Sequence, residues 1–294
     1  MNRFSAPTVP LHGTSRALGF LLAVGLLLAA ALSGPSHVAN LHLSAVKRSG
    51  ASFRVATFNL LGAIHTEHSK RFDTYDVRMP KAVELMNQYD FSVVGLQEFE
   101  QLQYDLWASE VGSTWSAYPG MELGKRPVQN SIVWRNDTWS VVEKHTYNIY
   151  YFHGNVVPEP YVLLQNKATG DQVWVVNTHN PADTHGPAER WRNRDQKIQI
   201  ALIKQLEATG FPVLLTGDFN EKADVYCDVT GHSNAQATNP GSWSGGTCHP
   251  PSHIRIDWIF RSPDLLSSNY TALDTDFVHQ ITDHKVIYSD VTVP

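Results

Sequence analysis

Six stretches of the sequence place a carboxylate, amide or imidazole side chain where a run of apolar residues ends. They are TFN with Asn59, LQE with Glu98, NTHN with His179, TGDFN with Asp218 and Asn220, RIDWIF with Asp257, and TDH with Asp283 and His284. Hard divalent cations prefer carboxylate and amide oxygens, and imidazoles and carboxylates transfer protons near neutral pH. If these strand ends converge, they form one active site that activates water beside a cation.

Each of these residues also has an ordinary structural explanation when it is considered alone. Asn59 could cap a turn, Glu98 could be a solvated strand-end carboxylate, and Asp218 with Asn220 could form an Asx-type turn. Asp257 differs because it interrupts an apolar strand, where a carboxylate without a partner is costly. The occurrence of all six stretches in one chain favours a shared functional site over independent coincidences.

The surrounding pattern predicts a strand-rich mixed α/β protein that positions these strand ends. Short β-branched and aromatic runs predict strands at residues 53–61, 91–95, 131–134, 140–145, 161–166, 172–177, 213–216, 254–260 and 286–291. Helical spacing of apolar residues predicts two helices, at residues 79–88 and 188–208. The first helix belongs to a strand–helix–strand unit, and the strands in the middle of the chain are expected to form an antiparallel meander.

Length and composition indicate a single globular domain that is acidic. The chain has 294 residues, of which 42% are hydrophobic and 17% are charged. Removing residues 1–34 takes away two of its 23 basic residues and none of its 28 acidic ones, which changes the net charge from −5 to −7. Overall charge therefore does not attract a phosphate-bearing substrate, which must be held by a local basic site or a cation.

The first fifty residues differ from the rest of the chain. Two arginines precede an unbroken apolar run at residues 17–32, and small, helix-breaking residues follow it. This arrangement predicts a secretory signal at residues 1–34, a flexible linker at 35–50 and the folded domain at 51–294, so the protein is expected to be secreted or extracytoplasmic. An uncleaved membrane anchor through residues 17–32 is the alternative, although the run is shorter than the roughly 20 residues that span a bilayer.

The chain has only two cysteines, Cys227 and Cys248, in one loop-like stretch rich in Gly, Ser, Thr, Asn and Pro. In an oxidising compartment we expect them to form a disulfide. The bond would close a loop of about twenty residues and stabilise the fold by about 3 kcal/mol. Metal ligation by the two thiolates is less favoured because the chain has no second cysteine pair.

The ordered set TFN, LQE, THN, GDFN, IDWIF and DH resembles the endonuclease/exonuclease/phosphatase superfamily. The resemblance extends from about residue 53 to the C-terminus, and GDFN and the final DH are its most specific parts. The family includes pancreatic-type deoxyribonucleases, abasic-site endonucleases, secreted sphingomyelinases and inositol-polyphosphate phosphatases. The resemblance implies an α/β fold, a four-layer sandwich of two packed mixed β-sheets flanked by helices, and the activity of a metal-dependent phosphoric ester hydrolase.

The resemblance also implies which residues bind a metal and which act on the phosphate. Glu98 would be the principal Mg²⁺ ligand, with Mn²⁺ as the alternative ion, and Asn59 would supply an amide oxygen to the metal or its water shell. His284 would be the general base or a group that polarises the phosphate. Asp283 would hold the ring of His284 in the required tautomer.

The other matching residues are implied to act on the attacking water and on the phosphoryl group. Asp218 would orient or deprotonate the water, and Asn220 would donate a hydrogen bond to a phosphate oxygen. Asp257 would orient a catalytic partner or bind a metal. His179 would stabilise the charge that builds on the phosphoryl oxygens. A metal at Glu98 would reverse the local field, which lets an acidic protein accept a phosphate anion.

Three departures from the family pattern concern the substrate. Asn180 follows the histidine of the third motif, where the family usually has an apolar residue. Lys285 follows the final DH, where the family more commonly has an aromatic or small residue and proline. The tyrosine and arginine contacts that nucleases of the family use are not identifiable in residues 104–130.

The substrate is therefore left open at the level of sequence. A phosphodiesterase or nuclease ranks first, ahead of a sphingomyelinase-like enzyme and an inositol- or sugar-phosphate phosphatase. The partner would be nucleic acid, a phospholipid headgroup or a small phosphate ester, and we expect a monomer with no obligate protein partner. Outside the enzyme class, the alternative is a non-catalytic protein that uses the same fold to bind an anion.

Two further groups of side chains could contact a substrate. One is a basic stretch of the second predicted helix, with Arg190, Arg192, Arg194 and Lys197. The other is a set of aromatic residues, Tyr150, Tyr151, Trp174, Trp191 and Trp243. A solvated helix face explains the first group more simply, and core or rim positions explain the second.

Overall fold

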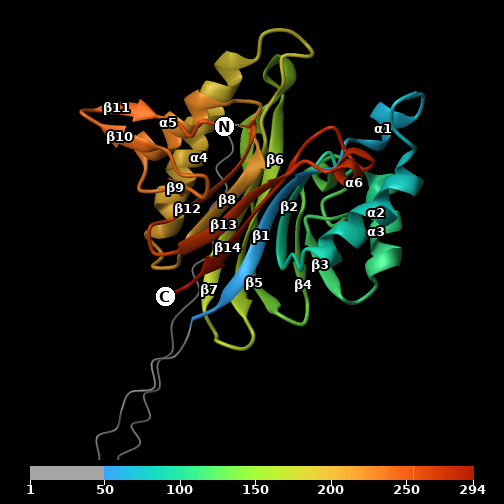
Figure 1. Cartoon of the computed structure of the whole chain (residues 1–294), viewed down its shortest axis with the longest axis horizontal. Coiled ribbons are helices and arrows are strands. Elements are labelled where there is room, and N and C mark those ends of the chain that lie inside the picture. Colours follow the sequence, from blue (N-terminus) through green and yellow to red (C-terminus); the bar gives the residue numbers. More distant parts are fainter. Residues whose placement is uncertain (1–49, 254) are drawn as a thin grey trace, which may run out of the picture. The chain divides into compact units, whose positions relative to one another are not determined.

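The apolar runs of the sequence form two six-stranded sheets in the computed structural model, which describes residues 50–253 and 255–294 (Figure 1). The first sheet contains β1 (Ser52–Asn59), β2 (Val93–Gln97), β3 (Trp115–Tyr118), β4 (Ile132–Arg135), β13 (Leu266–Leu273) and β14 (Val286–Thr292). The second contains β5 (Trp139–Tyr150), β6 (Val156–Asn166), β7 (Gln172–His179), β8 (Val213–Asp218), β9 (Gln236–Ala237) and β12 (Asp257–Arg261). The strand orders are β13-β14-β1-β2-β4-β3 and β5-β6-β7-β8-β12-β9.

Each sheet has one parallel pair of strands at its centre. Strands β1 and β2 are parallel, as are β7 and β8, and the other neighbours are antiparallel. A parallel pair needs a crossover connection. Helix α2 (Tyr75–Gln88) lies between β1 and β2 in the chain, and α4 (Glu189–Glu207) lies between β7 and β8. As a result, the carboxyl ends of both parallel pairs carry residues of the predicted site.

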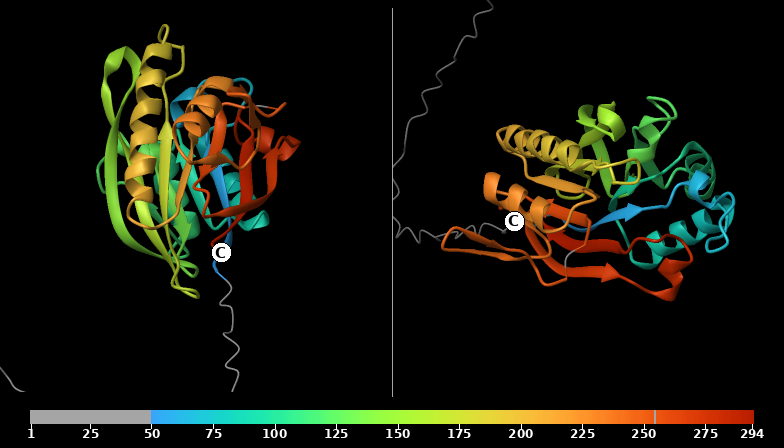
Figure 2. Two further views of the ribbon diagram at one scale, coloured as in Figure 1. Left: turned by 90° about the vertical axis from the view of Figure 1, so that its left-hand side faces the viewer. Right: turned by 90° about the horizontal axis from the view of Figure 1, so that it is seen from above.

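Three apolar clusters give the molecule four layers. One cluster joins the first sheet to α2 and to α3 (Gln101–Val111), with Phe58, Met79, Leu96 and Trp107 among its members. A second fills the space between the sheets, and a third joins the second sheet to α4 and to α5 (Ala223–His232). The helices therefore cover the two outer faces (Figures 1 and 2). The predicted four-layer α/β sandwich is confirmed.

The short elements complete the fold around these layers. They are the helices α1 (Ala63–Thr66) and α6 (Asp276–His279), the 3₁₀ turns η1 (Pro127–Asn130) and η2 (Phe152–Gly154), and a hairpin of β10 (Ser242–Ser244) and β11 (Thr247–His249). Cys227 and Cys248 form the expected disulfide, with their Cα atoms 5.8 Å apart. The bond links α5 to β11, so the prediction that the cysteines lie in a loop-like stretch was wrong: Cys227 is in a helix and Cys248 is in a short strand.

The predicted elements differ from the observed ones where local signals are weak. The long helix at 188–208 is confirmed as α4, and the first helix begins four residues earlier than predicted. Helices α3 and α5 and strands β3 and β13 were not predicted. The predicted strand at 131–134 corresponds to β4, which pairs with β2 and β3 in the first sheet instead of joining the meander.

The predicted signal, and the linker up to residue 49, lie outside the described residues. Among the residues that the structure describes, no helix is long and apolar enough to cross a membrane.

Candidate active site

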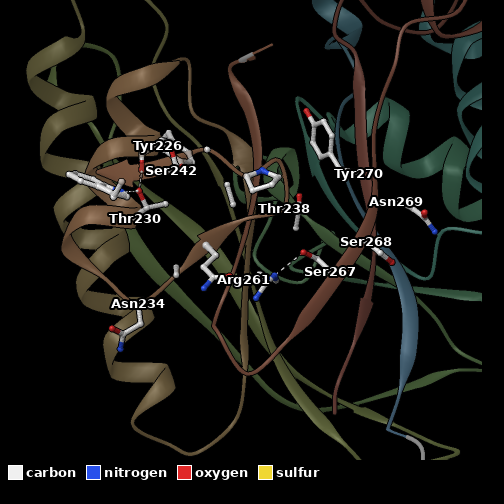
Figure 3. Close-up of a pocket in the computed structure, with 16 residues that line it drawn as sticks. Tyr226, Thr230, Asn234, Thr238, Ser242, Arg261, Ser267, Ser268, Asn269 and Tyr270 are labelled. Atoms are coloured by element: carbon white, nitrogen blue, oxygen red, sulfur yellow. Dashed lines mark hydrogen bonds between the residues drawn. The ribbon is translucent and has the colours of Figure 1, made fainter. Parts of the chain in front are cut away.

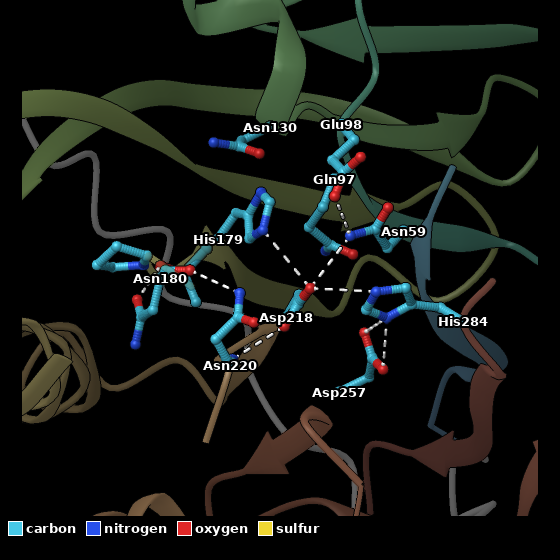
Figure 4. Close-up of polar contacts among 12 residues, drawn as sticks. Asn59, Gln97, Glu98, Asn130, His179, Asn180, Asp218, Asn220, Asp257 and His284 are labelled. Carbon is cyan, nitrogen blue, oxygen red and sulfur yellow. Dashed lines mark hydrogen bonds and ion pairs between the residues drawn. The ribbon is translucent and has the colours of Figure 1, made fainter. Parts of the chain in front are cut away.

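The carboxyl ends of the two parallel strand pairs bring the predicted residues together. Asn59 ends β1 beside the end of β2, and Glu98 follows β2 directly. In the second sheet His179 pairs with Asp218 at the ends of β7 and β8, and Asp218 pairs in turn with Asp257 at the start of β12. Figure 4 shows these side chains converging from both sheets on one point.

Asp218 lies at the centre of this group, and its side chain is 2% exposed. Its Oδ2 accepts a hydrogen bond from Asn59 Nδ2 at 3.1 Å and lies 3.5 Å from His179 Nε2 and 3.7 Å from His284 Nε2. Its Oδ1 accepts the backbone N–H of Asn220 at 2.9 Å. Two imidazoles and one amide thus surround a buried carboxylate, as Figure 4 shows.

Behind His284, the carboxylate of Asp257 contacts the other ring nitrogen. Nδ1 lies 3.0 and 3.1 Å from the two oxygens of Asp257. Burial by itself lowers the pKa of His284, but the charge of Asp257 and the hydrogen bond to it outweigh burial and raise that pKa to about 10. Burial raises the pKa of Asp257 to about 6, against the opposing effect of the His284 charge. At neutral pH the pair is therefore an imidazolium and a carboxylate.

The position of Asp283 differs from the predicted one. Asp283 is exposed, and the ring of His284 contacts Asp257 and Asp218 instead. The expectation that Asp283 holds the ring of His284 was wrong. The two residues are adjacent on a turn, so the side chain of Asp283 points away from that of His284. Of the two roles considered for Asp257, this geometry fits the orienting one.

Thr282 and Arg78 hold the loop that carries His284, and neither was predicted as part of the site. The hydroxyl of Thr282 donates to the carbonyl of Asn59 at 2.7 Å and accepts the backbone N–H of His284. The guanidinium of Arg78, buried under α2, donates to the carbonyls of Leu60, Leu61 and Ile281. Thr282 belongs to the TDH motif, so the sequence contained a signal for it. Nothing in the sequence distinguished Arg78 from any other arginine on a helix.

Glu98 and Asn59 form a second pair on the other side of Asp218. One oxygen of Glu98 accepts a hydrogen bond from Asn59 Nδ2 at 2.9 Å and the other accepts the Gly62 N–H at 2.8 Å. Burial raises the pKa of Glu98, but the charge of His179 and these two hydrogen bonds more than compensate, so the net shift is downward. Glu98 is thus held as a carboxylate at the edge of the pocket.

The amide of Asn59 turns its nitrogen toward the two carboxylates. Its oxygen accepts the backbone N–H of Leu61 at 3.0 Å, and its nitrogen donates to both Glu98 and Asp218. This hydrogen-bond pattern defines which atom is oxygen. Asn59 therefore holds the two carboxylates in place through its N–H groups, while its oxygen accepts a backbone N–H.

The donor set fits a hard divalent cation at Glu98. Both Glu98 oxygens keep a free lone pair, and the side chain lines the pocket with Asp218. Atoms of Asp218, Asp257 and His284 also lie within 4.8 Å of one another, close enough to hold an ion. We favour Glu98, because Asp257 contacts Nδ1 through both oxygens and does not line the pocket.

His179 and Asn220 lie on the remaining side of the pocket. His179 is buried, and the ring of Tyr151 meets its ring edge to face at 5.9 Å between centroids. Asn220 uses one N–H of its amide to bind the carbonyl of Asn180 at 2.8 Å. The second N–H of this amide is not used within the described chain, which fits the predicted hydrogen bond to a phosphate oxygen.

The pocket has a volume of about 390 Å³. Glu98, His179, Asp218, Asn220 and His284 form one part of its lining, and the walls include His65, Gln129, Tyr151, Phe152 and His185. Of these wall residues, only Tyr151 was among the aromatic side chains considered in the sequence, because single histidines and aromatics in loops carry no local signal. No lysine or arginine of the described chain lines the pocket.

The basic helix face does not reach the pocket. Arg192 is buried and binds Glu221, Asp183 and the carbonyl of Pro181. Arg190 and Arg194 stack on the ring of Trp191. Arg192 therefore stabilises the loop that follows His179. Other groups must bind the phosphate.

Comparison with known proteins assigns the family. The model of the endonuclease/exonuclease/phosphatase family matches residues 56–284, and the chain belongs to this family. Members are phosphoester hydrolases, generally dependent on divalent metals, and this chain is an enzyme of that class. No curated protein sequence matched significantly.

Solved structures share the fold at low sequence identity. A family member from Bacteroides thetaiotaomicron is 20% identical, with a TM-score of 0.66 over 83% of this chain and 99% of that one. The mannosyl-6-phosphatase of the same organism is 20% identical, with a TM-score of 0.63 over 81% and 99%. The human nocturnin catalytic domain, with bound sulfate, is 17% identical, with a TM-score of 0.65 over 83% and 95%.

Proposed function

We propose that the protein is an exported, Mg²⁺-dependent phosphodiesterase that cleaves its substrate by attack of water. The observation that carries this proposal is the Asp218 carboxylate between the imidazoles of His179 and His284, with Asp257 behind His284. A carboxylate in this position can accept a proton from water, while the imidazolium faces the phosphoryl oxygens. Mn²⁺ is the alternative ion.

The protonation states of the side chains determine the catalytic role that we assign to each. His284 carries its proton at neutral pH, so it acts as a donor to a phosphoryl oxygen and not as the base. Asp218 is the remaining candidate to orient and deprotonate water. Asn220 and His179 stabilise the equatorial oxygens. A dication bound at Glu98 would supply charge neutralisation and polarise the phosphoryl group.

Charge at the site favours a diester over a monoester. The acidic side chains at the site, Glu98, Glu100, Asp218 and Asp257, outnumber its one imidazolium, His284, so a bound dication leaves no excess of positive charge to attract a phosphate. A diester adds one negative charge and a monoester up to two. Because no described lysine or arginine lines the pocket, the diester is the better electrostatic match. Nucleic acids and phospholipid headgroups both supply such a bond.

A sugar-phosphate phosphatase is the second candidate. It is supported by the fold shared with the Bacteroides mannosyl-6-phosphatase and by the pocket volume of about 390 Å³, which is in the range of small-molecule sites. A lipid phosphodiesterase is less favoured. The β10–β11 hairpin exposes Trp243, but its other residues are Ser, Gly, Thr, Cys and His, so it lacks the apolar surface that enters a membrane.

A substrate panel tests the proposal directly. We expect turnover of bis(p-nitrophenyl) phosphate with Mg²⁺, little turnover of p-nitrophenyl phosphate, and none of either with chelator. DNA, RNA, sphingomyelin vesicles, inositol phosphates and mannose 6-phosphate would then rank natural substrates. Faster hydrolysis of the monoesters would replace this proposal with the phosphatase, and no turnover of any ester would support a non-catalytic anion-binding protein.

Export can be tested separately from activity. The predicted signal at residues 1–34 should be absent from protein recovered outside the cytoplasm, so N-terminal sequencing should begin near residue 35. Full-length protein in the membrane fraction would instead support the anchor through residues 17–32. Full-length protein in the cytoplasm would contradict export.

A further inference from the structure

A second cavity at the surface is larger than the active-site pocket. It has a volume of about 660 Å³, against about 390 Å³ for the active site, and the two share no lining residue. It lies between the edge strand β13 on one side and α5, β9 and β10 on the other, as Figure 3 shows. A cavity of this size is within the range of roughly 300–1,000 Å³ for small-molecule sites.

The lining of this cavity offers no free charge. Among the described residues that line it there is no aspartate, glutamate, lysine or histidine, and Arg261 is the one charged residue. The guanidinium of Arg261 already donates to the side chains of Ser267 and Gln236, both at 2.8 Å, and to two backbone carbonyls. A ligand that fits this lining is therefore neutral, since neither an anion nor a cation finds an uncompensated partner.

Two aromatic rings of the cavity are held in fixed positions. The indole N–H of Trp243 donates to Thr230 at 3.0 Å, and a Cβ at Gly231 would lie only 2.8 Å from the indole ring. A Cβ at Gly241 would lie 2.6 Å from the hydroxyl of Tyr226. Trp243 is nevertheless 45% exposed. Its ring therefore presents an apolar surface whose orientation is set before any ligand arrives.

The same cavity contains polar side chains without partners. The hydroxyl of Thr238 is buried and makes no hydrogen bond within the described residues, and Figure 3 places it between β13 and the α5 side. Asn234, Ser242 and Ser268 are exposed, and their side chains also make no hydrogen bond to the described part of the chain. An acyl chain would cover these groups without satisfying them, which is costly.

We propose that this cavity binds a short neutral oligosaccharide. A sugar ring has C–H groups on its face, which pack on Trp243, and hydroxyls at its edge, which bind the exposed amide and hydroxyl groups of Asn234, Ser242 and Ser268. The disulfide between Cys227 and Cys248 ties the two elements that carry Tyr226 and the hairpin of Trp243. The site is independent of the catalytic pocket and of the phosphodiesterase proposal.

Titration of the purified protein with neutral trisaccharides tests this site. Maltotriose, cellotriose, chitotriose and mannotriose are titrated while tryptophan fluorescence and heat are recorded. We expect at least one to bind and to change the tryptophan emission. Binding should persist in Asp218→Asn and in the presence of inorganic phosphate, because the catalytic pocket takes no part. Loss of binding under either condition would place the sugar in the catalytic pocket and overturn the proposal.

Variants of the lining assign the binding to this cavity. Trp243→Ala should weaken binding about tenfold, as expected for loss of a stacked ring, and Asn234→Ala should weaken it several-fold. Trp191→Ala is the control, since Trp191 is another tryptophan that is partly exposed but lies on α4 and does not line this cavity. Unchanged thermal unfolding of Asn234→Ala, an exposed position, confirms that folding is not the cause.

Three outcomes would contradict the proposal. The first is absence of binding by all four sugars at 10 mM, about the weakest affinity that such a site would have. The second is equal loss of binding in Trp191→Ala and Trp243→Ala. The third is binding of a neutral Ser/Gly-rich peptide at this cavity without binding of any sugar, which would assign the site to a peptide.

Discussion

His284 and Asp257 come from different sheets, and the ring nitrogen Nδ1 lies 3.0 and 3.1 Å from the two carboxylate oxygens. His284 precedes β14 of the first sheet, whereas Asp257 begins β12 of the second. The contact therefore exists only when the two sheets pack as they do here. It connects the architecture of the sandwich to the protonation of the group that faces the phosphate.

Replacement of Asp257 should change the pH dependence of catalysis. Without the carboxylate, the two largest influences that raise the pKa of His284 are lost, so this pKa falls from about 10, with Asp218 and Asp283 still opposing the effect of burial. Asp257→Asn should therefore lower kcat/KM about 100-fold at pH 8, within the range for loss of a positioned acid. Part of the loss should be recovered as the pH falls toward 6. The measurement is the pH profile of kcat/KM for bis(p-nitrophenyl) phosphate.

Asp283→Asn is the matched control for this prediction. It removes the neighbouring carboxylate, which is exposed and does not contact the ring. Its pH profile should follow that of the wild type. A large loss in Asp283→Asn with little effect of Asp257→Asn would show that the wrong aspartate has been assigned.

Replacement of Asn59 tests whether this residue positions Glu98 and Asp218 by hydrogen bonds or binds the metal itself. Asn59→Asp keeps an oxygen but removes the N–H groups that bind Glu98 and Asp218, and it adds a third carboxylate between them. We expect Asn59→Asp and Asn59→Ala each to raise the Mg²⁺ concentration for half-maximal activity by at least about tenfold, as loss of an outer-sphere hydrogen bond does. Wild-type metal affinity in Asn59→Asp would instead identify residue 59 as a ligand.

Burial of Glu159 should make stability depend on pH. Burial raises its pKa well above the ordinary value, against hydrogen bonds from the His179 backbone and the Asn130 amide. When a carboxyl group has a higher pKa in the folded chain than in the unfolded chain, it adds to the free energy of unfolding. This contribution is fully present below the pKa of the unfolded chain, about 4.3 for Glu. That contribution is lost as the pH rises through the folded pKa. Wild-type Tm should therefore fall relative to that of Glu159→Gln between pH 4.5 and 8.

The measurement is thermal unfolding of the two proteins in parallel across this range. Glu159→Gln keeps the acceptor for Asn130 and has no charge to bury, so the comparison isolates one titration. Parallel Tm curves would show that Glu159 titrates alike in the folded and unfolded chains.

The sequence was sufficient to predict the strand ends, because each motif combines an apolar run with a polar residue that a buried strand does not need. Asn59, Glu98, His179, Asp218, Asp257 and His284 do converge. The partner of His284 could not be predicted, since adjacency in sequence favoured Asp283 while the packing of two sheets supplies Asp257. The orientation of the Asn59 amide depends on the Leu61 N–H, which is set by backbone conformation alone.

Other parts of the fold were missed for equally local reasons. Helix α5 lies in a stretch rich in small polar residues, and packing of Val225, Tyr226 and Val229 against the second sheet stabilises it. Helix α3 buries Gln103 beside Trp107 and Val111, so its apolar pattern was incomplete, although Glu100 and Gln103 form a capping box. Strand β13 is an exposed edge strand with few buried residues, which weakens the alternation that predicts strands.

The most direct test of the active-site assignment is the rate of Asp218→Asn on bis(p-nitrophenyl) phosphate at saturating Mg²⁺. The substitution keeps the shape of the side chain and an acceptor for Asn59, and removes the group that takes the proton from water. We predict a kcat at least about 10³-fold below that of the wild type, with KM changed by less than about threefold. A kcat within about tenfold of the wild type would contradict the assignment.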